Sequence, residues 1–257
     1  TGLNHLPVSE LAARGISVFN VHGNAESVAE RALAMTLAFY GRVVEYHNDL
    51  KGGLWHGFWV GKGKEDDWTS IFRKKCAIFG TEAIGTVLAR LLKAFDCEVS
   101  GFRRRAEMGI PPCFDRMETD FEAAVEGSEI LFNALPLTPS TRGIFSERIL
   151  SEAGGKFLVN VGRGETVDED GLWKALSNGV LRGAAIDTWY DYPDHGSLRG
   201  WPSRHPFQDL PNVILSPHVG GSTGEAIEIA SRQTFDNVSS WLLTGGGPRL
   251  TNLGEVY

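Results

Sequence analysis

Short apolar segments alternate with segments of helical periodicity from Lys74 onward, and this alternation restricts the fold more than any other feature. Strand-like apolar segments lie at 74–79, 97–102, 130–134, 157–161, 184–189 and 213–216. Helical patterns lie between them, at 83–95, 146–152 and 168–177. Because parallel strands are joined through helical crossovers, this order predicts an α/β fold with a doubly wound parallel sheet covered by helices on both faces.

The remaining segments predict a smaller accompanying unit. Residues 15–20 have the pattern of a short strand, and Asn24 offers a helix cap before apolar residues recur at helical spacing from Val28 to Val43, which predicts one long amphipathic helix. Residues 51–70 are rich in Gly, Trp and charge without a period, as in a connection. Ser222 and Glu225 have capping-box spacing and introduce a helix to about Leu243.

Composition narrows the class of partner. The net charge of -7 is spread over 257 residues without a long basic or acidic block, which argues against a nucleic-acid surface and a polybasic membrane anchor. No run of about 18 apolar residues occurs, so we expect no membrane span. The three cysteines are odd in number and form no CxxC pair, so we expect no disulfide framework and no metal site, and a reducing, cytoplasmic setting.

A glycine-containing turn joins the first predicted strand of the sheet to its helix. The sequence Phe79-Gly80-Thr-Glu-Ala-Ile-Gly85 has the context of a dinucleotide-binding loop of Rossmann type, in which helix amides meet the pyrophosphate. Gly80, Ile84 and Gly85 are the candidate cofactor contacts. The motif G-x-G-x-x-G has glycine where this chain has Glu82, and a carboxylate about 4 Å from a phosphate would cost on the order of 4 kcal/mol unless it turned away. The alternative is that the two glycines only permit a tight turn and close helix packing.

The next strand ends in consecutive arginines. Enzymes that use NAD usually carry an acid here, which accepts hydrogen bonds from the ribose hydroxyls. Arg103 stands near that position and is followed by Arg104 and Arg105. A guanidinium suits a 2'-phosphate, so the sequence favours NADP over NAD, while the alternative is a solvated arginine run.

Four later motifs carry a resemblance to a known family. They are Asn133-Ala-Leu-Pro-Leu-Thr138 with Thr141-Arg-Gly143, Val159-Asn-Val-Gly-Arg-Gly164 with Val167-Asp168, Gly183-Ala-Ala-Ile-Asp187, and Pro211-Asn-Val-Ile-Leu-Ser-Pro-His218. Their order resembles that of the D-2-hydroxyacid dehydrogenases. The resemblance implies an NAD(P)-dependent oxidoreductase that transfers a hydride between the nicotinamide and a small 2-oxo or 2-hydroxy acid.

The resemblance also implies roles for individual residues. His218 would give a proton to the nascent alkoxide in reduction and accept it in oxidation, and Arg163 would orient the substrate carboxylate and polarise the carbonyl. Asp187 would hydrogen-bond the nicotinamide carboxamide, Pro136 would border its ring, and Gly220 is a further candidate cofactor contact. Taken singly, His218 could be a capping histidine and Arg163 a surface cation; the matching motifs favour the catalytic roles.

One catalytic position departs from the family pattern. The family usually has a glutamate after the Asp187 strand, which hydrogen-bonds the histidine and raises its pKa, whereas this chain has Tyr192. Similar formate dehydrogenases carry glutamine there, so loss of the acid is compatible with activity. Asp191 or Asp194 could replace it if the loop were shifted.

The resemblance further implies a domain division. Residues 1–50 would be a remnant of a flavodoxin-like substrate domain with its hinge helix, 51–221 the dinucleotide-binding domain, and 222–257 a helix that returns to the substrate domain. The start at Thr1 and the resemblance of the first residues to the middle of that domain suggest that roughly a hundred residues precede them in relatives. An incomplete substrate domain should expose apolar surface on the helix from Val28 to Val43, which favours a homodimer.

A second function stays open at this point. Glu82, Tyr192 and the missing first strands would also suit a catalytically impaired nucleotide-binding or interaction protein descended from such an enzyme. The presence of both Arg163 and His218 favours the enzyme.

Overall fold

Seven parallel strands form the central sheet of the computed structural model, which describes residues 2–3, 5–55, 67–104, 109–247, 249–251 and 253. The spatial order is β3-β2-β1-β4-β5-β6-β7, and every neighbouring pair is parallel. The strands are β1 (Lys75–Phe79), β2 (Glu98–Phe102), β3 (Arg116–Glu118), β4 (Ile130–Asn133), β5 (Phe157–Asn160), β6 (Gly183–Ile186) and β7 (Val213–Leu215). The predicted doubly wound parallel sheet is confirmed.

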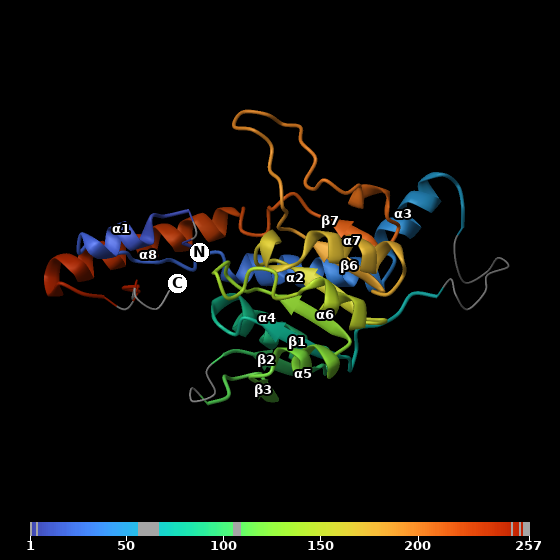
Figure 1. The fold of residues 1–257 in the computed structure, drawn as a ribbon, viewed down its shortest axis with the longest axis horizontal. Helices are drawn as coiled ribbons and strands as arrows, with labels where there is room; N and C mark the ends of the chain where they lie inside the picture. Colours follow the sequence, from blue (N-terminus) through green and yellow to red (C-terminus); the bar gives the residue numbers. More distant parts are fainter. Residues whose placement is uncertain are drawn as a thin grey trace.

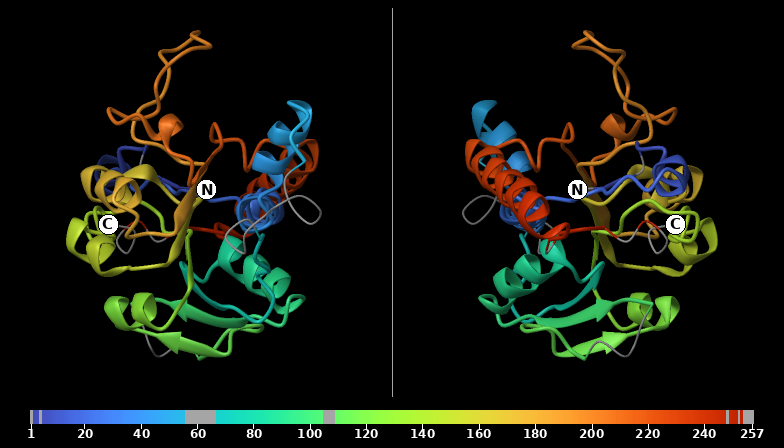
Figure 2. Two further views of the ribbon diagram at one scale, coloured as in Figure 1. Left: turned by 90° about the vertical axis from the view of Figure 1, so that its right-hand side faces the viewer. Right: turned by 90° about the vertical axis from the view of Figure 1, so that its left-hand side faces the viewer.

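Alternate side chains of the strands point to opposite faces, and each face has its own apolar core. On β1, Cys76 and Ile78 join one cluster, while Ala77 and Phe79 join the other. The first cluster is completed by α2 (Ala25–Tyr40) and α4 (Ala83–Lys93), and the second by α5 (Phe121–Glu126), α6 (Glu147–Glu152) and α7 (Glu169–Ser177). Figure 2 shows the two helix layers on either side of the sheet.

Side-chain caps fix where several helices begin. Asp120, Ser146, Asp168 and Thr223 each accept a hydrogen bond from the amide three residues later, at the starts of α5, α6, α7 and α8 (Gly224–Thr244). The cap of α8 is thus Thr223, one residue later than the predicted Ser222, because its Oγ1 reaches the amide of Ala226 at 3.1 Å. The predicted course of this helix to about Leu243 is otherwise confirmed.

Two predictions for the N-terminal segment are wrong. Residues 15–20 form no strand, since they have no neighbouring strand in the described structure and Phe19 makes only an isolated antiparallel bridge with Leu250. The long helix is interrupted after Tyr40, because Arg42 takes a left-handed conformation with φ 51°, and a second helix, α3 (Val43–Lys51), begins there.

The expected exposure of the Val28 to Val43 helix is also wrong for most of its length. Val28, Ala32 and Met35 are buried in the core beneath α2. Exposed apolar side chains lie instead on α3 and along α8, which include Val43, Leu50, Phe235, Leu242 and Leu243. In Figure 1, α1 (Val8–Ala13) and α8 overlap and both extend away from the sheet, while Figure 2 shows them apart from one another.

Two features of the connections position the site. The loop between β6 and β7 projects from the body of the molecule (Figure 1) and carries the short 3-10 helix Phe207–Asp209 at its base. The loop after β5 contains a second 3-10 helix, Gly164–Thr166.

No helix in the described part of the chain has the length and apolar character that a membrane span requires. Arg105 lies outside the described residues.

Candidate active site

The predicted site residues gather at the carboxyl ends of the central strands. Strands β1 and β4 are neighbours, and the chain winds in opposite directions on either side of them. In open parallel sheets, ligands bind in the crevice outside the strand ends at this reversal. Gly80 follows β1, Pro136 follows β4, Arg163 follows β5 and Asp187 follows β6.

The turn after β1 has the geometry of a close approach between backbones. Gly80 has φ +97°, and a Cβ there would lie 2.9 Å from the carbonyl oxygen of Ala134. Gly85 is buried, and a Cβ on it would overlap the carbonyl of Gly80, so both positions require glycine. Ile84 lies between these glycines in the first turn of α4, partly buried against the core.

The side chain of the glutamate in this loop does not cap the N-terminus of α4. Glu82 is the cap residue, its side chain makes no capping hydrogen bond, and it is exposed. The first amides of α4 therefore remain without a side-chain cap at the carboxyl edge of the sheet, where a pyrophosphate would be bound. The residues present thus fit a dinucleotide, with the Glu82 carboxylate on the solvent side.

The two described arginines after β2 differ in their surroundings. The guanidinium of Arg103 donates through Nη2 to the carbonyl of Gly109, and its buried Nε has no partner among the described residues. Arg104 is exposed, and its Nη1 donates to Ser140 Oγ at 2.9 Å. Ser140 in turn shares a 3.1 Å hydrogen bond with Thr138 Oγ1. Arg104 therefore connects β2 to the loop after β4, where exposed Pro136 also lies.

Arg163 is held by a buried polar network that sequence reasoning missed. Its carbonyl accepts hydrogen bonds from Asn160 Nδ2 at 3.2 Å and from Thr166 Oγ1 at 2.6 Å. Asn133 Nδ2 donates to Asn160 Oδ1 at 2.9 Å and to Thr166 Oγ1 at 2.6 Å. All three polar side chains are at most 2% exposed, so the network fixes the backbone that carries Arg163. The signal for it was an asparagine at the end of two apolar strands.

His218 and Tyr192 come together from two different loops. Tyr192 Oη lies 2.9 Å from His218 Nδ1 and accepts the Trp189 amide at 3.1 Å. The phenol hydroxyl can donate to an unprotonated Nδ1 or accept from an Nδ1–H, so the direction of this bond follows the protonation of the imidazole. Tyr192 therefore makes the contact that the family's glutamate was expected to make, and it requires no replacement by Asp191 or Asp194.

Asp187 clamps the backbone around His218. The histidine has φ 57°, a left-handed conformation uncommon for a residue with a side chain. Asp187 Oδ1 accepts the Val219 amide and Oδ2 accepts the Gly220 amide, each at 3.0 Å, and the carboxylate also accepts the hydroxyl of Ser216. Since Asp187 is 2% exposed, these bonds satisfy a carboxylate that is nearly inaccessible to water.

The groups around His218 have opposing effects on its pKa. Partial burial lowers the pKa of His218, the negative charge of Asp187 raises it, and the positive charge of Arg163 lowers it. Partial burial also raises the pKa of Tyr192, which keeps the phenol protonated near neutral pH. The structure thus brings Arg163, Asp187, Tyr192 and His218 into one constellation around an imidazole that titrates below its ordinary value.

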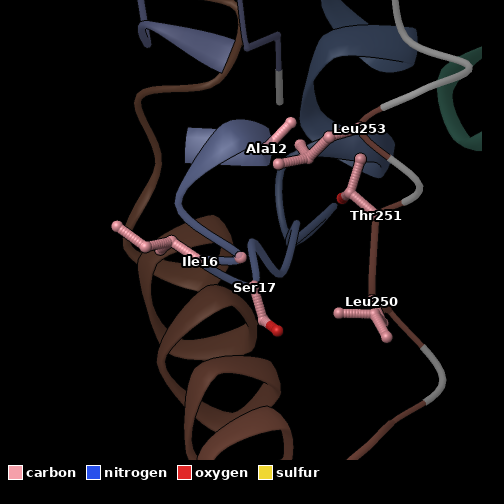
Figure 3. Close-up of a pocket in the computed structure, with 7 residues that line it drawn as sticks. Ala12, Ile16, Ser17, Leu250, Thr251 and Leu253 are labelled. Atoms are coloured by element: carbon pink, nitrogen blue, oxygen red, sulfur yellow. The ribbon is translucent and has the colours of Figure 1, made fainter. Parts of the chain in front are cut away.

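A separate pocket lies apart from this constellation. Figure 3 shows it between the turn after α1 and the residues Leu250, Thr251 and Leu253. None of its lining residues is titratable; they are Ala12, Gly15, Ile16, Ser17, Leu250, Thr251 and Leu253. No group of three or more His, Cys, Asp or Glu side chains in the described ranges could hold a metal ion.

Comparison with known proteins decides the family. The sequence profile of the D-isomer specific 2-hydroxyacid dehydrogenase, NAD binding domain, matches residues 33–220. The chain belongs to this family. It is 34% identical over 217 residues to glyoxylate/hydroxypyruvate reductase B of Pectobacterium carotovorum, which covers 83% of this chain and 64% of the relative. Glyoxylate reductase of Thermofilum pendens is 28% identical over 98% of this chain and 72% of the relative.

A solved structure agrees with the sequence relatives. NADPH-dependent glyoxylate/hydroxypyruvate reductase from Sinorhizobium meliloti, crystallised with NADP and malonate, superposes with a TM-score of 0.81 at 28% identity. The match covers 98% of this chain and 75% of that chain. The chain thus spans about two thirds to three quarters of the length of these relatives, and each of them is named as a reductase.

Proposed function

We propose that this chain is an NAD(P)-dependent oxidoreductase that interconverts a small 2-oxo acid and the corresponding 2-hydroxy acid. The observation that carries the proposal is the meeting of His218, Tyr192 and Arg163 at the carboxyl edge of the sheet, beside the Gly80 turn. Reduction of a 2-oxo acid needs a proton donor for the oxygen and a cation for the carboxylate, and this constellation contains both.

His218 is the proton donor in this proposal. With Nδ1 engaged by Tyr192 Oη, the imidazole presents Nε2 to the substrate oxygen. In reduction, the imidazolium gives its Nε2 proton to the developing alkoxide while its Nδ1–H donates to Tyr192 Oη. In oxidation, the neutral ring keeps its proton on Nδ1, and the unprotonated Nε2 accepts the hydroxyl proton. Because the pKa of His218 is lowered, we expect reduction to be favoured at mildly acidic pH and oxidation to persist to lower pH than an unperturbed histidine would allow.

Arg163 binds the carboxylate of the substrate. Its guanidinium is partly exposed at the strand ends, and its Nη1 donates to the carbonyl of Gly162 at 2.7 Å. The planar fork orients a carboxylate through paired hydrogen bonds, and its charge polarises the adjacent carbonyl. The buried Asn160 and Thr166 contacts hold this geometry before substrate arrives.

The cofactor of the proposal is NADP, with NAD as the alternative. When bound, the nicotinamide supplies or accepts the hydride. Gly80, Ile84 and Gly85 would receive the pyrophosphate, and Arg104 with Ser140 would contact a 2'-phosphate. Arg103 would support the loop around the 2'-phosphate rather than contact the phosphate, since its guanidinium already donates to the carbonyl of Gly109. Pro136 would border the nicotinamide, as the family pattern implies, and Gly220 is a further candidate cofactor contact.

Asp187 has a different role in this proposal from the one that the family pattern assigns to it. The family pattern assigns its carboxylate to the nicotinamide carboxamide, yet three donors of the His218 loop already occupy it. We propose that Asp187 acts first on His218, by holding its backbone and by opposing the depression of its pKa.

The names of the relatives suggest the first substrates to test. Glyoxylate and hydroxypyruvate should be reduced with NADPH oxidation, followed by absorbance. His218→Ala should lower the rate by about 10²- to 10⁴-fold, the typical loss for a positioned general acid. The matched control is His47→Ala, an exposed histidine on α3, which should behave as wild type. Binding of NADPH without turnover of either acid by the wild-type chain would overturn the proposed activity.

Assembly and location complete the proposal. The exposed apolar residues on α3 and α8 support self-association as a homodimer, and the three free cysteines suit a reducing, cytoplasmic setting. The division into 1–50, 51–221 and 222–257 remains a prediction. Light scattering after size exclusion tests the assembly, and a monomer at working concentration would exclude the dimer.

A further inference from the structure

A chain of hydrogen bonds connects helix α2 to the loop that carries His218. Arg31 lies on α2 and donates to Ser216 Oγ through Nε at 3.2 Å and through Nη2 at 3.0 Å. Ser216 lies at the end of β7, two residues before His218, and its hydroxyl bonds to Asp187 Oδ1. Arg31 lies outside the family motifs, and Ser216 lies within the last of them without an assigned role.

The direction of these hydrogen bonds is fixed by chemistry. A guanidinium can only donate, so Ser216 Oγ must accept both bonds from Arg31 with its two lone pairs. Its single proton is then available only to Asp187. The Asp187 carboxylate must therefore accept this hydrogen bond. Its other two partners, the amides of Val219 and Gly220, are donors as well. Three donors thus converge on the two oxygens of Asp187, which is the pattern that a carboxylate accepts.

The same chain joins two opposite charges across one hydroxyl. Asp187 and Ser216 are each 2% exposed, and an ionised carboxylate that is so buried needs a compensating charge or several donors. Arg31 supplies a cation one hydroxyl away, from helix α2, whereas the other residues around His218 lie in loops that follow the strands. The base of the Arg31 side chain also lies close to the loop that Asp187 holds. A Cβ on Gly220 would be 2.8 Å from Asp187 Oδ2 and 3.6 Å from Arg31 Cβ.

We propose that Arg31 is a positioning residue for His218: through the hydroxyl of Ser216 it orients and partly neutralises the Asp187 carboxylate that clamps the His218 loop. Arg31 touches neither the imidazole nor a reacting atom in this assignment. It sets how much negative charge His218 experiences. The catalytic consequence rests on the function proposed above, whereas the effect on the imidazole can be measured without cofactor or substrate.

The groups that face His218 determine the sign of the effect. They are Asp187 at the end of β6, Arg163 after β5 and Tyr192 in the projecting loop, with Arg31 on α2 behind Asp187. Removing the Arg31 charge leaves Asp187 less compensated, which favours the imidazolium. A charge within about 4–6 Å moves a pKa by 1 to 3 pH units, and Arg31 acts from farther away, so we expect the pKa of His218 to rise by about half a pH unit in Arg31→Met.

The test is an NMR titration of the histidine side chains in the protein without ligand. The His218 resonances are assigned by their loss in His218→Gln, and circular dichroism confirms that each variant is folded. Arg31→Met and Ser216→Ala should both raise the pKa of His218, the first because the compensating charge is lost and the second because Asp187 loses the hydroxyl donor that shares its charge. Arg31→Lys keeps a charged donor and should stay near wild type. Arg232→Met, which removes an exposed arginine from α8, is the matched control.

The outcomes separate the inference from the proposed function. A His218 pKa in Ser216→Ala and Arg31→Met equal to that of wild type overturns the positioning role of Arg31, whether or not the chain is an active reductase. If Arg31→Met does not fold, the comparison of Ser216→Ala with Arg31→Lys decides: equal values in both contradict the proposal. In an active enzyme, the same variants should move the alkaline limb of the kcat profile for reduction upward while leaving the KM for NADPH unchanged, a combination that a purely structural defect would not produce.

Discussion

Replacing Tyr192 by glutamate tests the electrostatics of the site most directly. The phenol oxygen lies 2.9 Å from His218 Nδ1, so a carboxylate at this position would face the imidazole at hydrogen-bond distance. Near neutral pH the neutral phenol adds no charge, because partial burial raises its pKa. Tyr192→Glu therefore adds one negative charge and keeps an acceptor for the Nδ1 proton.

The size of the effect follows from the geometry and the exposure. Two unit charges about 4 Å apart attract by about 1 kcal/mol in water and about 4 kcal/mol at an effective dielectric near 20. Tyr192 is 52% exposed, so solvent screens the pair and the lower half of that range applies. An attraction of about 1–2.5 kcal/mol corresponds to a rise of roughly 0.7 to 1.8 pH units in the pKa of His218.

The pH profile of reduction measures this shift. Since the proton donor is the imidazolium, a raised His218 pKa keeps the donor protonated to higher pH, and the alkaline limb of kcat for glyoxylate reduction should move upward by the same amount. Tyr192→Gln is the matched control, because it offers a polar side chain without charge. Superimposable profiles for Tyr192→Glu and Tyr192→Gln would refute the assignment of His218 as the donor facing residue 192.

Three further predictions concern the cofactor loop and the Arg163 backbone. Arg104→Ala should weaken NADPH binding by about ten- to a hundredfold and leave NADH unchanged in calorimetry, since it removes a charge-assisted contact to the 2'-phosphate; equal losses for both cofactors would contradict this role. Glu82→Gly should strengthen binding of both cofactors, measured by NADPH and NADH fluorescence, because it removes a negative charge near the pyrophosphate; weaker binding would show that the carboxylate has a positive role. Asn160→Ala should raise the KM for the 2-oxo acid more than that for NADPH, because it removes one of the hydrogen bonds that hold the carbonyl of Arg163, and it should lower the free energy of unfolding by about 1–3 kcal/mol in urea denaturation; a selective rise in the NADPH KM would be the contrary result.

The sheet was predictable because its central strands are buried on both faces. Strands such as β4 and β5 are buried at every residue, so their sequences are continuous apolar runs. Strand β3 lies at the edge, has three residues, and each is only partly buried, so Arg116-Met-Glu118 gives no such run. The interruption after Tyr40 escaped prediction for another reason, since it depends on a left-handed arginine rather than on proline.

The site was predictable as a set of residues and not as a set of contacts. Arg163, Tyr192 and His218 occupy motif positions whose spacing is visible in the sequence, and the structure brings them together. The contacts of Asp187 with the amides after His218 depend on how two loops meet, which no spacing encodes. The same holds for Arg31, which is one polar residue among many on an amphipathic helix.

The clamp on His218 explains how an unfavourable backbone conformation persists at the centre of the site. A residue with a side chain in the left-handed region is disfavoured by about 1–3 kcal/mol. Two hydrogen bonds from amides to an ionised carboxylate contribute about 1.5–3 kcal/mol each, so the Asp187 contacts exceed the strain as long as the carboxylate is charged. The position of the imidazole is therefore tied to the ionisation of one buried acid, and whatever stabilises that charge, the Ser216 hydroxyl and Arg31 behind it included, also holds the proton donor in place.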